Sequence, residues 1–278
     1  MTILVTGARG HVGAAVLNEL LAAGEAVRAS SRDPRPGQLP DGVEVVRADL
    51  TEPESLPDAL AGVRKVFLYA HPETAEEFAA SARKAGVEHV VLLSSSSVLY
   101  PERDANPIAL RHLTVERALE QAGLDWTFVR PGYFATNLLR WRSIRAERAL
   151  RTAFPEATTS PVHERDIAAI AARALLDDAH RRAAYPVLGP GPLTTREQVA
   201  AIAEALGEPV RLEEVDVDTY RGDLRTQLPE FLIERLVQSR GQVSELPAEL
   251  ATDAVPAVLG RPALPFAEWA RDHVADFR

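Results

Sequence analysis

The chain has 278 residues, enough for one large α/β domain or for two smaller units. Hydrophobic residues make up 46% and charged residues 26% of the sequence, which is typical of a globular protein and not of a disordered one. No apolar run reaches the roughly 18 residues that a membrane span needs, so we expect a cytoplasmic protein with no membrane partner. The net charge of −9 argues against nucleic acid as a partner, and the absence of cysteine excludes disulfides and thiolate-bound metals.

The basic residues are divided unevenly between lysine and arginine. Only two of the 31, Lys65 and Lys84, are lysines, which leaves few places for a catalytic lysine. The seven histidines are scattered along the chain without the spacing of metal ligands. We therefore predict no metal site.

Short apolar runs alternate with segments of helical spacing in the first half of the chain. Strands are expected at residues 2–6, 26–30, 43–47, 65–69, 89–94 and 126–129, and helices at residues 11–23, 54–61, 74–85 and 108–122. This alternation predicts a parallel sheet with helices on both faces. Because crossovers between parallel strands are right-handed, the expected fold class is α/β, a Rossmann-type doubly wound parallel sheet.

The pattern changes in the second half of the chain. We expect a helix at residues 164–176, a strand at 184–188, a turn at 189–192, a helix ending at 206, a strand at 209–217, and helices near 220–239 and 266–277. The chain is accordingly divided into a dinucleotide-binding domain, residues 1–135 and 160–190, and a smaller C-terminal α/β substrate cap, residues 136–159 and 191–278. The cap is expected to cover the carboxyl edge of the sheet, where ligands of such folds bind.

A glycine-rich turn joins the first expected strand to the first expected helix. The segment reads TGARGHVG, in which Gly7 permits the tight turn, Gly10 lets the backbone approach a pyrophosphate and Gly13 lets the helix pack close to the strand. The helix N-terminus then faces the anion. The sequence therefore predicts dinucleotide binding, with phosphate-loop contacts from Gly7, Arg9, Gly10, His11, Val12 and Gly13.

The end of the second strand distinguishes NAD from NADP. An acidic residue about 20 residues past the glycines would bind the ribose hydroxyl of NAD, but no carboxylate stands here before Asp33. Arg32, with Ser31 and Arg9, suits the additional phosphate of NADP, because a guanidinium binds phosphate through paired hydrogen bonds. The alternative is that Arg32 is an ordinary solvated arginine. We expect NADP(H) as the cofactor.

Two residues after the third strand are candidates for the adenine site. Asp49 could hold the edge of the ring and Leu50 could cover its face. The alternative is that Asp49 caps the following helix. Both residues are included among the expected cofactor contacts.

Several motifs together resemble one known family. They read TGARGHVG, VRASSRDP, RADL, VVLLSSSSVLY, DWTFVRPGYFATNLL, HERDIAAIAARAL and YPVLGPGPLTTREQVAAIAEALGEPV. The combination resembles the NmrA-like, NAD(P)H-binding family of atypical short-chain dehydrogenases/reductases, from residue 1 to about residue 217. The resemblance implies a Rossmann fold and a dinucleotide cofactor. The family includes NADPH-dependent quinone reductases, reductases of small unsaturated compounds, and proteins that bind the dinucleotide without turning it over.

The chain departs from the wider superfamily at its catalytic pair. Orthodox members carry Tyr-x-x-x-Lys, in which the lysine lowers the tyrosine pKa, but none of the five tyrosines here has a lysine four residues on. His112 and Glu116 stand on the corresponding helix, four residues apart and therefore on one face. His112 could serve as a proton donor or substrate anchor tuned by Glu116. The alternative is an ordinary pair on the helix surface.

Two further strand ends supply candidates at the carboxyl edge. Ser94 ends the fifth strand and is expected to contact the cofactor, and resemblance to the extended branch of the superfamily aligns Ser96 with the catalytic serine. The alternative for this serine run is a polar exit from the strand. Tyr69, Ala70 and His71 leave the fourth strand and are expected to border the cofactor. His71 could face the nicotinamide and substrate, or be a solvated loop residue.

The segment after the sixth strand completes the predicted site. Resemblance to the family places Pro131 beside the nicotinamide and assigns Tyr133, Phe134 and Asn137 to the substrate pocket. The alternative is that these aromatic residues belong to the core of the cap. Asp166, in the HERDIA motif, is interpreted as a structural residue at a helix start and not as a general base.

The missing Tyr-Lys pair constrains the substrate. Hydride transfer to a simple ketone leaves a basic alkoxide that needs an acid, whereas transfer to a quinone or conjugated carbonyl leaves a delocalised anion. We predict an NADPH-dependent reductase of a small, hydrophobic, quinone-like or conjugated carbonyl substrate, with Ser96, His112 or Tyr133 assisting protonation. The alternatives are a non-catalytic NADP(H)-binding redox sensor of the NmrA type and a non-redox reaction such as isomerisation. The sequence does not fix the oligomeric state and is compatible with a homodimer.

Overall fold

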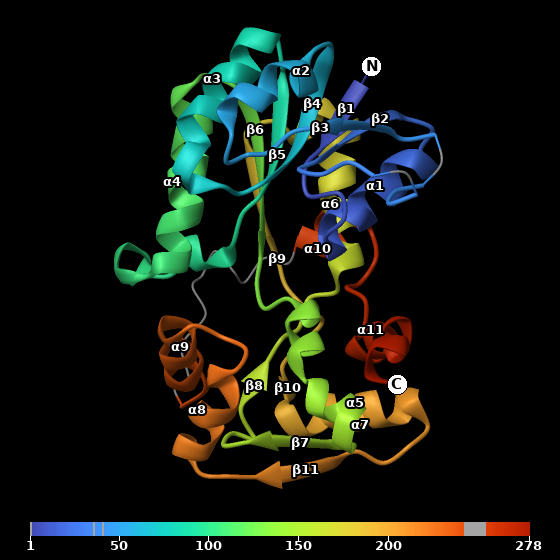
Figure 1. Ribbon diagram of the computed structural model, residues 1–278, viewed down its shortest axis with the longest axis vertical. Helices are drawn as coiled ribbons and strands as arrows, with labels where there is room; N and C mark the ends of the chain where they lie inside the picture. The colour runs from blue at the N-terminus through green and yellow to red at the C-terminus, as the bar shows by residue number, and fades with distance from the viewer. Residues whose placement is uncertain (1, 36, 41, 242–253) are drawn as a thin grey trace. The chain divides into compact units, whose positions relative to one another are not determined.

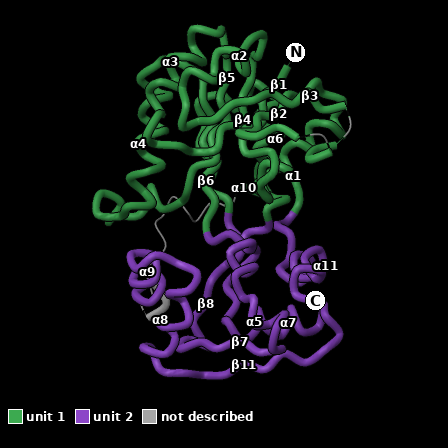
Figure 2. The backbone as a smooth tube through the Cα atoms, in the orientation of Figure 1, with its two compact units in different colours: residues 1–132, 164–187, 247–261 green, residues 133–163, 188–246, 262–278 purple. Residues whose placement is uncertain are grey.

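The computed structural model describes residues 2–35, 37–40, 42–241 and 254–278 (Figure 1). The chain folds into two units, each with its own core (Figure 2). Unit 1 comprises the described residues of 1–132, 164–187 and 247–261, and unit 2 comprises those of 133–163, 188–246 and 262–278. Among the described residues, no helix combines the length and the apolar character needed to cross a bilayer.

Unit 1 is built on a seven-stranded parallel sheet in the order β3-β2-β1-β4-β5-β6-β9. The strands are β1 (Thr2–Val5), β2 (Ala26–Ser31), β3 (Glu44–Arg47), β4 (Val63–Tyr69), β5 (His89–Leu93), β6 (Asp125–Pro131) and β9 (Ala183–Val187). The strand order proceeds from β1 to β2 and β3 on one side and from β4 to β5, β6 and β9 on the other, so it reverses between β1 and β4. The predicted doubly wound fold is therefore confirmed. Register pairs Val5 with Ala29 on one side and with Phe67 on the other.

Helices cover both faces of this sheet. On one face α1 (His11–Ala22) packs against α6 (Glu164–Leu176), and the other face carries α2 (Leu56–Leu60), α3 (Ala75–Ala85) and α4 (Pro107–Gln121) (Figure 1). Both faces of β4 and β5 are thereby buried, which explains why these strands read as nearly continuous apolar runs. The buried side chains of α2, α3 and α4 form one core with the sheet.

Unit 2 has a smaller core. In it β7 (Ala149–Thr152) pairs in parallel with β11 (Arg211–Glu214), and β8 (Thr158–Thr159) pairs antiparallel with β10 (Leu193–Thr194). Helices α5 (Arg142–Glu147), α7 (Thr195–Leu206) and α11 (Phe266–Asp272) surround these strands, with 3-10 turns η5 (Ala135–Arg140) and η8 (Val274–Phe277). Trp269 is fully buried and stacks on Phe266 at 5.2 Å between ring centroids. A capping box of Thr194 and Glu197 begins α7, as expected for a threonine N-cap.

The structure differs from the expected elements near the C-terminus. The single helix expected near residues 220–239 is two helices, α8 (Val217–Arg225) and α9 (Glu230–Gly241), because Pro229 has no N–H to continue the first. The helix α10 (Ala254–Leu259) packs against α6 and β9 of unit 1, whereas the sequence placed this segment in the cap. The remainder of that stretch, residues 242–253, lies outside the described residues.

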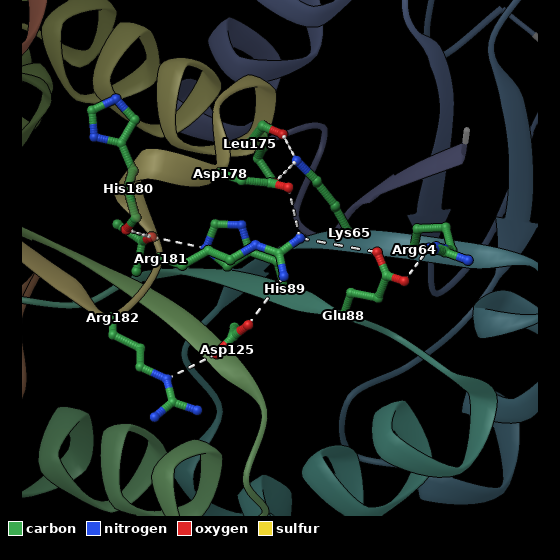
Figure 3. A network of polar contacts seen from close by, with 11 residues as sticks. Arg64, Lys65, Glu88, His89, Asp125, Leu175, Asp178, His180, Arg181 and Arg182 are labelled. Carbon is green, nitrogen blue, oxygen red and sulfur yellow. Dashed lines mark hydrogen bonds and ion pairs between the residues drawn. The ribbon is translucent and has the colours of Figure 1, made fainter.

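A polar network lies at the amino ends of the central strands (Figure 3). Arg181 pairs with Asp178 at 3.0 Å and with Asp125 of β6 at 3.1 Å. Lys65 of β4 is 4% exposed, and its Nζ donates to the carbonyl oxygen of Leu175 at 2.7 Å and to the Asp178 carboxylate at 2.8 Å. The network ties the end of α6 and the following turn to the sheet, at the edge opposite the phosphate loop.

Lys65 is expected to act in stability. Replacing it with methionine removes the donor to the Leu175 carbonyl oxygen and to Asp178, so the free energy of unfolding should fall by about 2 kcal/mol in a urea titration. The chain offers a matched control, because its other lysine, Lys84, is exposed on α3. Lys84→Met should change stability by less than about 0.5 kcal/mol. Equal effects of the two substitutions would contradict this role.

Candidate functional site

The loop between β1 and α1 has the geometry of an anion site. Gly7 takes a φ of +64°, and the backbone N–H of Gly10 donates to the Gly7 carbonyl oxygen at 2.9 Å, which closes the turn. Gly10 is the N-cap of α1 and provides no side-chain hydrogen bond. A helix N-terminus without a side-chain cap is suited to an external acceptor such as a phosphate.

Gly13 is held to glycine by close packing. A Cβ at this position would lie 2.2 Å from the Gly7 carbonyl oxygen and 2.7 Å from its carbon. Of the other predicted loop residues, Arg9 and His11 are exposed, whereas Val12 is buried in the core. The helix thus begins directly against the turn, and the residues present fit the pyrophosphate of a dinucleotide.

The end of β2 offers polar groups next to this loop. The Ser31 side chain is buried, and its Oγ has no hydrogen-bond partner among the described residues, while Arg32 beside it is exposed. A buried hydroxyl without a partner is a group that a ligand can satisfy. Arg9 lines a cavity of about 320 Å³ together with Gln38 and the α1 residue Asn18. These positions fit the phosphate-binding role expected for Ser31, Arg32 and Arg9, which stays a prediction.

Asp49 has a local structural partner. Its carboxylate accepts hydrogen bonds from the backbone N–H of Thr51 at 2.9 Å and from the Thr51 hydroxyl at 2.8 Å. These bonds, and the positive charge of Arg32, hold the pKa of Asp49 below its usual value. These bonds close a local turn at Thr51 and do not cap the following 3-10 helix, whose N-cap is Glu52, and the adenine contact stays a prediction. Leu50 packs against the core of unit 1, and its carbonyl oxygen accepts the Thr74 hydroxyl.

The residues that leave β4 stand at the carboxyl edge. Tyr69 is 58% exposed, and its Cβ lies 3.5 Å from where a Cβ on Gly7 would be, so it borders the phosphate loop. Because the Thr74 hydroxyl donates to Leu50, it accepts from the His71 Nδ1 at 3.0 Å. The His71 Nε2 lies 3.6 Å from the Glu73 carboxylate. His71 is therefore fixed by the turn that also carries Ala70, and its contact with nicotinamide or substrate stays a prediction.

A buried carboxylate joins the ends of β5 and β6. Glu116 of α4 accepts the Ser94 hydroxyl at 2.6 Å, the Arg130 Nε at 2.9 Å and the Arg130 Nη2 at 2.7 Å. Its side chain is 4% exposed. The pair predicted between Glu116 and His112 is therefore replaced by a fork with Arg130, a residue fourteen positions along the chain. The Ser94 hydroxyl faces Glu116, so a cofactor contact through this hydroxyl is not supported by the geometry.

His112 lies one turn before Glu116 on α4. Its Nδ1 is buried and has no hydrogen bond among the described residues. Burial lowers the pKa of His112 to about 4, although the charge of Glu116 opposes the shift. At neutral pH the ring is therefore uncharged, and a role as imidazolium donor would need a ligand that raises this pKa.

Ser96 and Pro131 are buried at the ends of neighbouring strands. Ser96 begins the 3-10 turn η3 (Ser96–Leu99) and is 6% exposed. Pro131 is the last residue of β6 and pairs in register with Val187. Their contacts with cofactor or substrate stay predictions. Within the described ranges, no group of three or more histidine, aspartate or glutamate side chains could hold a metal ion.

A match to a known protein family identifies the kind of cofactor that this chain binds. A family model described as NAD(P)H-binding matches residues 7–178, which is more than half of the chain. The chain belongs to this NAD(P)H-binding family. The match runs from the phosphate loop through α6 and so covers every strand of the sheet except β1 and β9. The expected family and its dinucleotide cofactor are confirmed.

Relatives and solved structures extend the match along the whole protein. The chain is 37% identical over 279 residues to the (4-alkanoyl-5-oxo-2,5-dihydrofuran-3-yl)methyl phosphate reductase of Streptomyces griseus, with 99% of each chain covered. It is 34% identical over 286 residues to the NAD(P)H azoreductase of Xenophilus azovorans, again with 99% of each covered. The structure of Citrobacter sp. triphenylmethane reductase matches with a TM-score of 0.79 over 99% of this chain and 100% of that one. At 24% identity, this last likeness shows the fold alone.

In this NAD(P)H-binding protein, unit 2 contains the three predicted pocket residues that follow β6 in the sequence. Tyr133 packs against the core of unit 2, and its carbonyl oxygen accepts the N–H of Val162 at 2.7 Å. Phe134 forms an isolated bridge with Val162. The Asn137 Oδ1 accepts Arg140 Nη1 at 3.2 Å. These contacts agree with the core alternative for Tyr133, and the substrate roles of all three predicted residues stay untested.

The sequence did not predict that two arginines of this NAD(P)H-binding protein form ion pairs with buried carboxylates. Arg130 was noted only as part of the DWTFVRPGYFATNLL motif, and its fork with Glu116 joins residues too far apart in sequence for a helical-spacing rule. Arg261 pairs with Asp166 at 2.7 Å, and Asp166 is 1% exposed at the start of α6. The structural interpretation of Asp166 thus acquires a partner. For the pair of Arg130 and Glu116, the only signal in the sequence was that a glutamate occupies a position on the buried face of a helix.

Proposed function

We propose that this protein is an NADPH-dependent reductase that transfers hydride to a small, largely apolar conjugated acceptor. The observation that carries the proposal is the whole-length similarity to two relatives named as reductases, one of a dihydrofuranone and one of azo compounds. The ring carbon–carbon double bond of the first is conjugated with carbonyl groups, and the azo bond of the second is conjugated by its substituents. A quinone or enone belongs to the same electronic class, which is the class expected from the sequence.

This class of acceptor suits the residues of the carboxyl edge. The bound reduced dinucleotide supplies a hydride to the far carbon of the conjugated system, the electron pair moves to the carbonyl oxygen, and a proton from solvent completes the reduction. Because the negative charge is delocalised, the protein need only donate hydrogen bonds to that oxygen and position the acceptor. A lysine-assisted tyrosine, which this chain lacks, is not required.

Arg32 is proposed to give the preference for NADPH. Arg32→Ala should weaken NADPH binding by about ten- to a hundredfold and leave NADH binding within about twofold, because only NADPH carries the additional phosphate. Calorimetric titration with both dinucleotides measures this. Arg35→Ala is the matched control, since Arg35 lies on the same loop, is exposed and pairs with Asp33. Equal affinity of the unaltered protein for NADPH and NADH would contradict the assignment.

The proposed function is tested by NADPH consumption. The purified protein should oxidise NADPH in the presence of a quinone, an unsaturated lactone or an azo dye, and should be much slower with simple aldehydes and ketones. Tight NADPH binding without consumption by any acceptor would overturn the reductase and support the redox-sensor alternative.

The proposal also covers the character of the substrate, the location of the protein and its partners. We propose a small hydrophobic substrate, in line with the acceptor class above. The net charge of −9 supports the absence of a nucleic-acid partner, and the absence of cysteine supports a cytoplasmic location. A homodimer is compatible with the sequence. Light scattering after size-exclusion chromatography distinguishes a monomer of 30.2 kDa from a dimer.

A further inference from the structure

The Glu116 carboxylate has its hydrogen-bonding capacity taken up inside the protein. One oxygen accepts from Ser94 and from the Arg130 Nε, and the other accepts from the Arg130 Nη2. A carboxylate that is 4% exposed and holds three hydrogen bonds is unsuited to exchange protons with a substrate. It instead fixes the arginine that it binds.

Arg130 keeps donors that no described residue takes up. A guanidinium has five N–H groups, and Glu116 takes the Nε–H and one of those on Nη2. One face of the group lies over the Phe128 ring, with 5.5 Å between the Arg130 Cζ and the ring centroid. The orientation is therefore set by an edge contact and a face contact, and Nη1 presents two N–H groups in a fixed direction.

A cavity of about 390 Å³ opens beside this guanidinium. Its walls come from η3, β6, β9 and α10, all within unit 1, and include Leu99, Arg130, Ala184, Tyr185, Pro186 and Ala257. The Tyr185 hydroxyl is already bonded to the His180 Nδ1 at 2.6 Å. Among the described residues that line it, Arg130 is the charged one, and the volume is in the range of sites for small molecules.

The cavity lies near the carboxyl ends of β6 and β9. Its lining residues Arg130 and Pro186 are the next-to-last residues of these two strands and pair in register. In a doubly wound sheet each half holds one mononucleotide, on either side of the switch point. Here the phosphate loop follows β1, so β4, β5 and β6 form the half opposite the adenosine end.

We infer that Arg130 donates hydrogen bonds to the carbonyl oxygen of the acceptor in this cavity, and that Glu116 and Ser94 are positioning residues. This inference rests on the proposed reductase function and names its polar contact. The negative charge that moves to the carbonyl oxygen during reduction meets N–H groups already aimed at it. The group supplies the stabilisation that a tyrosine hydroxyl gives in orthodox members of the superfamily.

The charges of Arg130 and Glu116 indicate that the ligand is uncharged. Arg130 and Glu116 sum to zero, so the cavity offers hydrogen-bond donors without a net positive charge. A neutral carbonyl, as in a quinone or enone, gains these bonds at little cost in lost hydration. A carboxylate would be taken out of water without a compensating charge and should bind poorly.

Binding to the oxidised holoprotein tests this without turnover. With NADP+ bound, menadione should bind at least about tenfold more tightly than naphthoate in calorimetric titrations. Glu116→Gln leaves Arg130 positive and should reverse the order by strengthening naphthoate binding about tenfold. Glu116→Leu with Arg130→Met replaces the pair by apolar groups, keeps the fold intact and should weaken menadione binding about tenfold. Arg117→Met, at an exposed position on α4, is the matched control and should change neither affinity.

A second variant avoids the buried pair altogether. Ala257 is exposed on α10 and lines the cavity, so Ala257→Phe should fill it, raise the KM for menadione at least about fivefold and leave NADPH affinity unchanged. If NADPH is oxidised at unchanged rates by the Arg130 and Ala257 variants, the inference is overturned while the reductase stands. If no acceptor is reduced but menadione binding still depends on Arg130, the cavity site stands and the proposed function fails.

Discussion

Replacing Gly13 with alanine is expected to weaken NADPH binding by a hundredfold or more. The added Cβ would lie 2.2 Å from the Gly7 carbonyl oxygen, a backbone atom that cannot move without opening the turn. The helix N-terminus would shift away from the strand, and the N–H groups of its first turn would no longer converge on a phosphate. The same overlap should lower the free energy of unfolding by about 1–3 kcal/mol. Fluorescence titration with NADPH and urea unfolding measure the two effects separately.

Two other glycines calibrate this result. At Gly10 the added Cβ would be 3.3 Å from the same oxygen, so Gly10→Ala should have a smaller effect on stability. Gly222 lies within α8 and has nothing within 4 Å of an added Cβ, so Gly222→Ala should raise stability by up to about 1 kcal/mol. Undiminished NADPH binding by Gly13→Ala would contradict the placement of the pyrophosphate.

Acid is expected to destabilise the protein through His89. This residue of β5 is fully buried, and its Nε2 lies 2.8 Å from the Thr127 hydroxyl, which itself donates to the His180 carbonyl oxygen at 2.6 Å. Nε2 must therefore donate, and a second proton on the buried Nδ1 would find no hydrogen-bond acceptor among the described residues. Burial, with the charges of Lys65 and Arg181, lowers the pKa of His89 to about 4, against the opposing charges of Asp178 and Asp125.

The pH window follows from the direction of this shift. The folded pKa lies below the unfolded value of 6.5, so the contribution of His89 is complete above pH 6.5 and is lost as pH falls from there toward 4. The loss amounts to about 3 kcal/mol in the free energy of unfolding. His112, whose pKa is also lowered to about 4, adds a smaller loss because it is partly exposed. Urea unfolding at several pH values measures the slope.

A conservative variant isolates the histidine. Glutamine can place an amide N–H where His89 Nε2 donates and cannot titrate, so His89→Gln should flatten the pH dependence whatever its effect at neutral pH. Adding His112→Gln should flatten it further. An unchanged slope in the double variant would show that other groups carry the acid sensitivity.

The fold and the phosphate loop could be predicted because their signals are local. The Gly7, Gly10 and Gly13 spacing lies within one turn, and residues 66–68 of β4 and 90–93 of β5 are apolar and buried. Helix breaks were less visible. Pro229 was present in the sequence, yet residues 220–239 were predicted as one helix.

The polar pairs could not be predicted, because their partners are distant along the chain. Helical spacing brought Glu116 to His112, but the topology places Arg130 of β6 beside Glu116 and gives the histidine no partner among the described residues. Likewise, nothing near Lys65 indicates that its ammonium is held by residues more than a hundred positions away. The assignment of α10 to unit 1 has the same cause, since this helix packs on α6 and β9.

The most direct test of the account is the consumption of NADPH by the purified protein with menadione, followed by the absorbance of the reduced nicotinamide. The account predicts saturable oxidation that depends on the protein, is abolished in Gly13→Ala and is reduced at least about tenfold in kcat/KM in the Glu116→Leu, Arg130→Met double variant. Tight binding of NADPH with no oxidation above the rate without protein, for menadione and for every other conjugated acceptor, would contradict it.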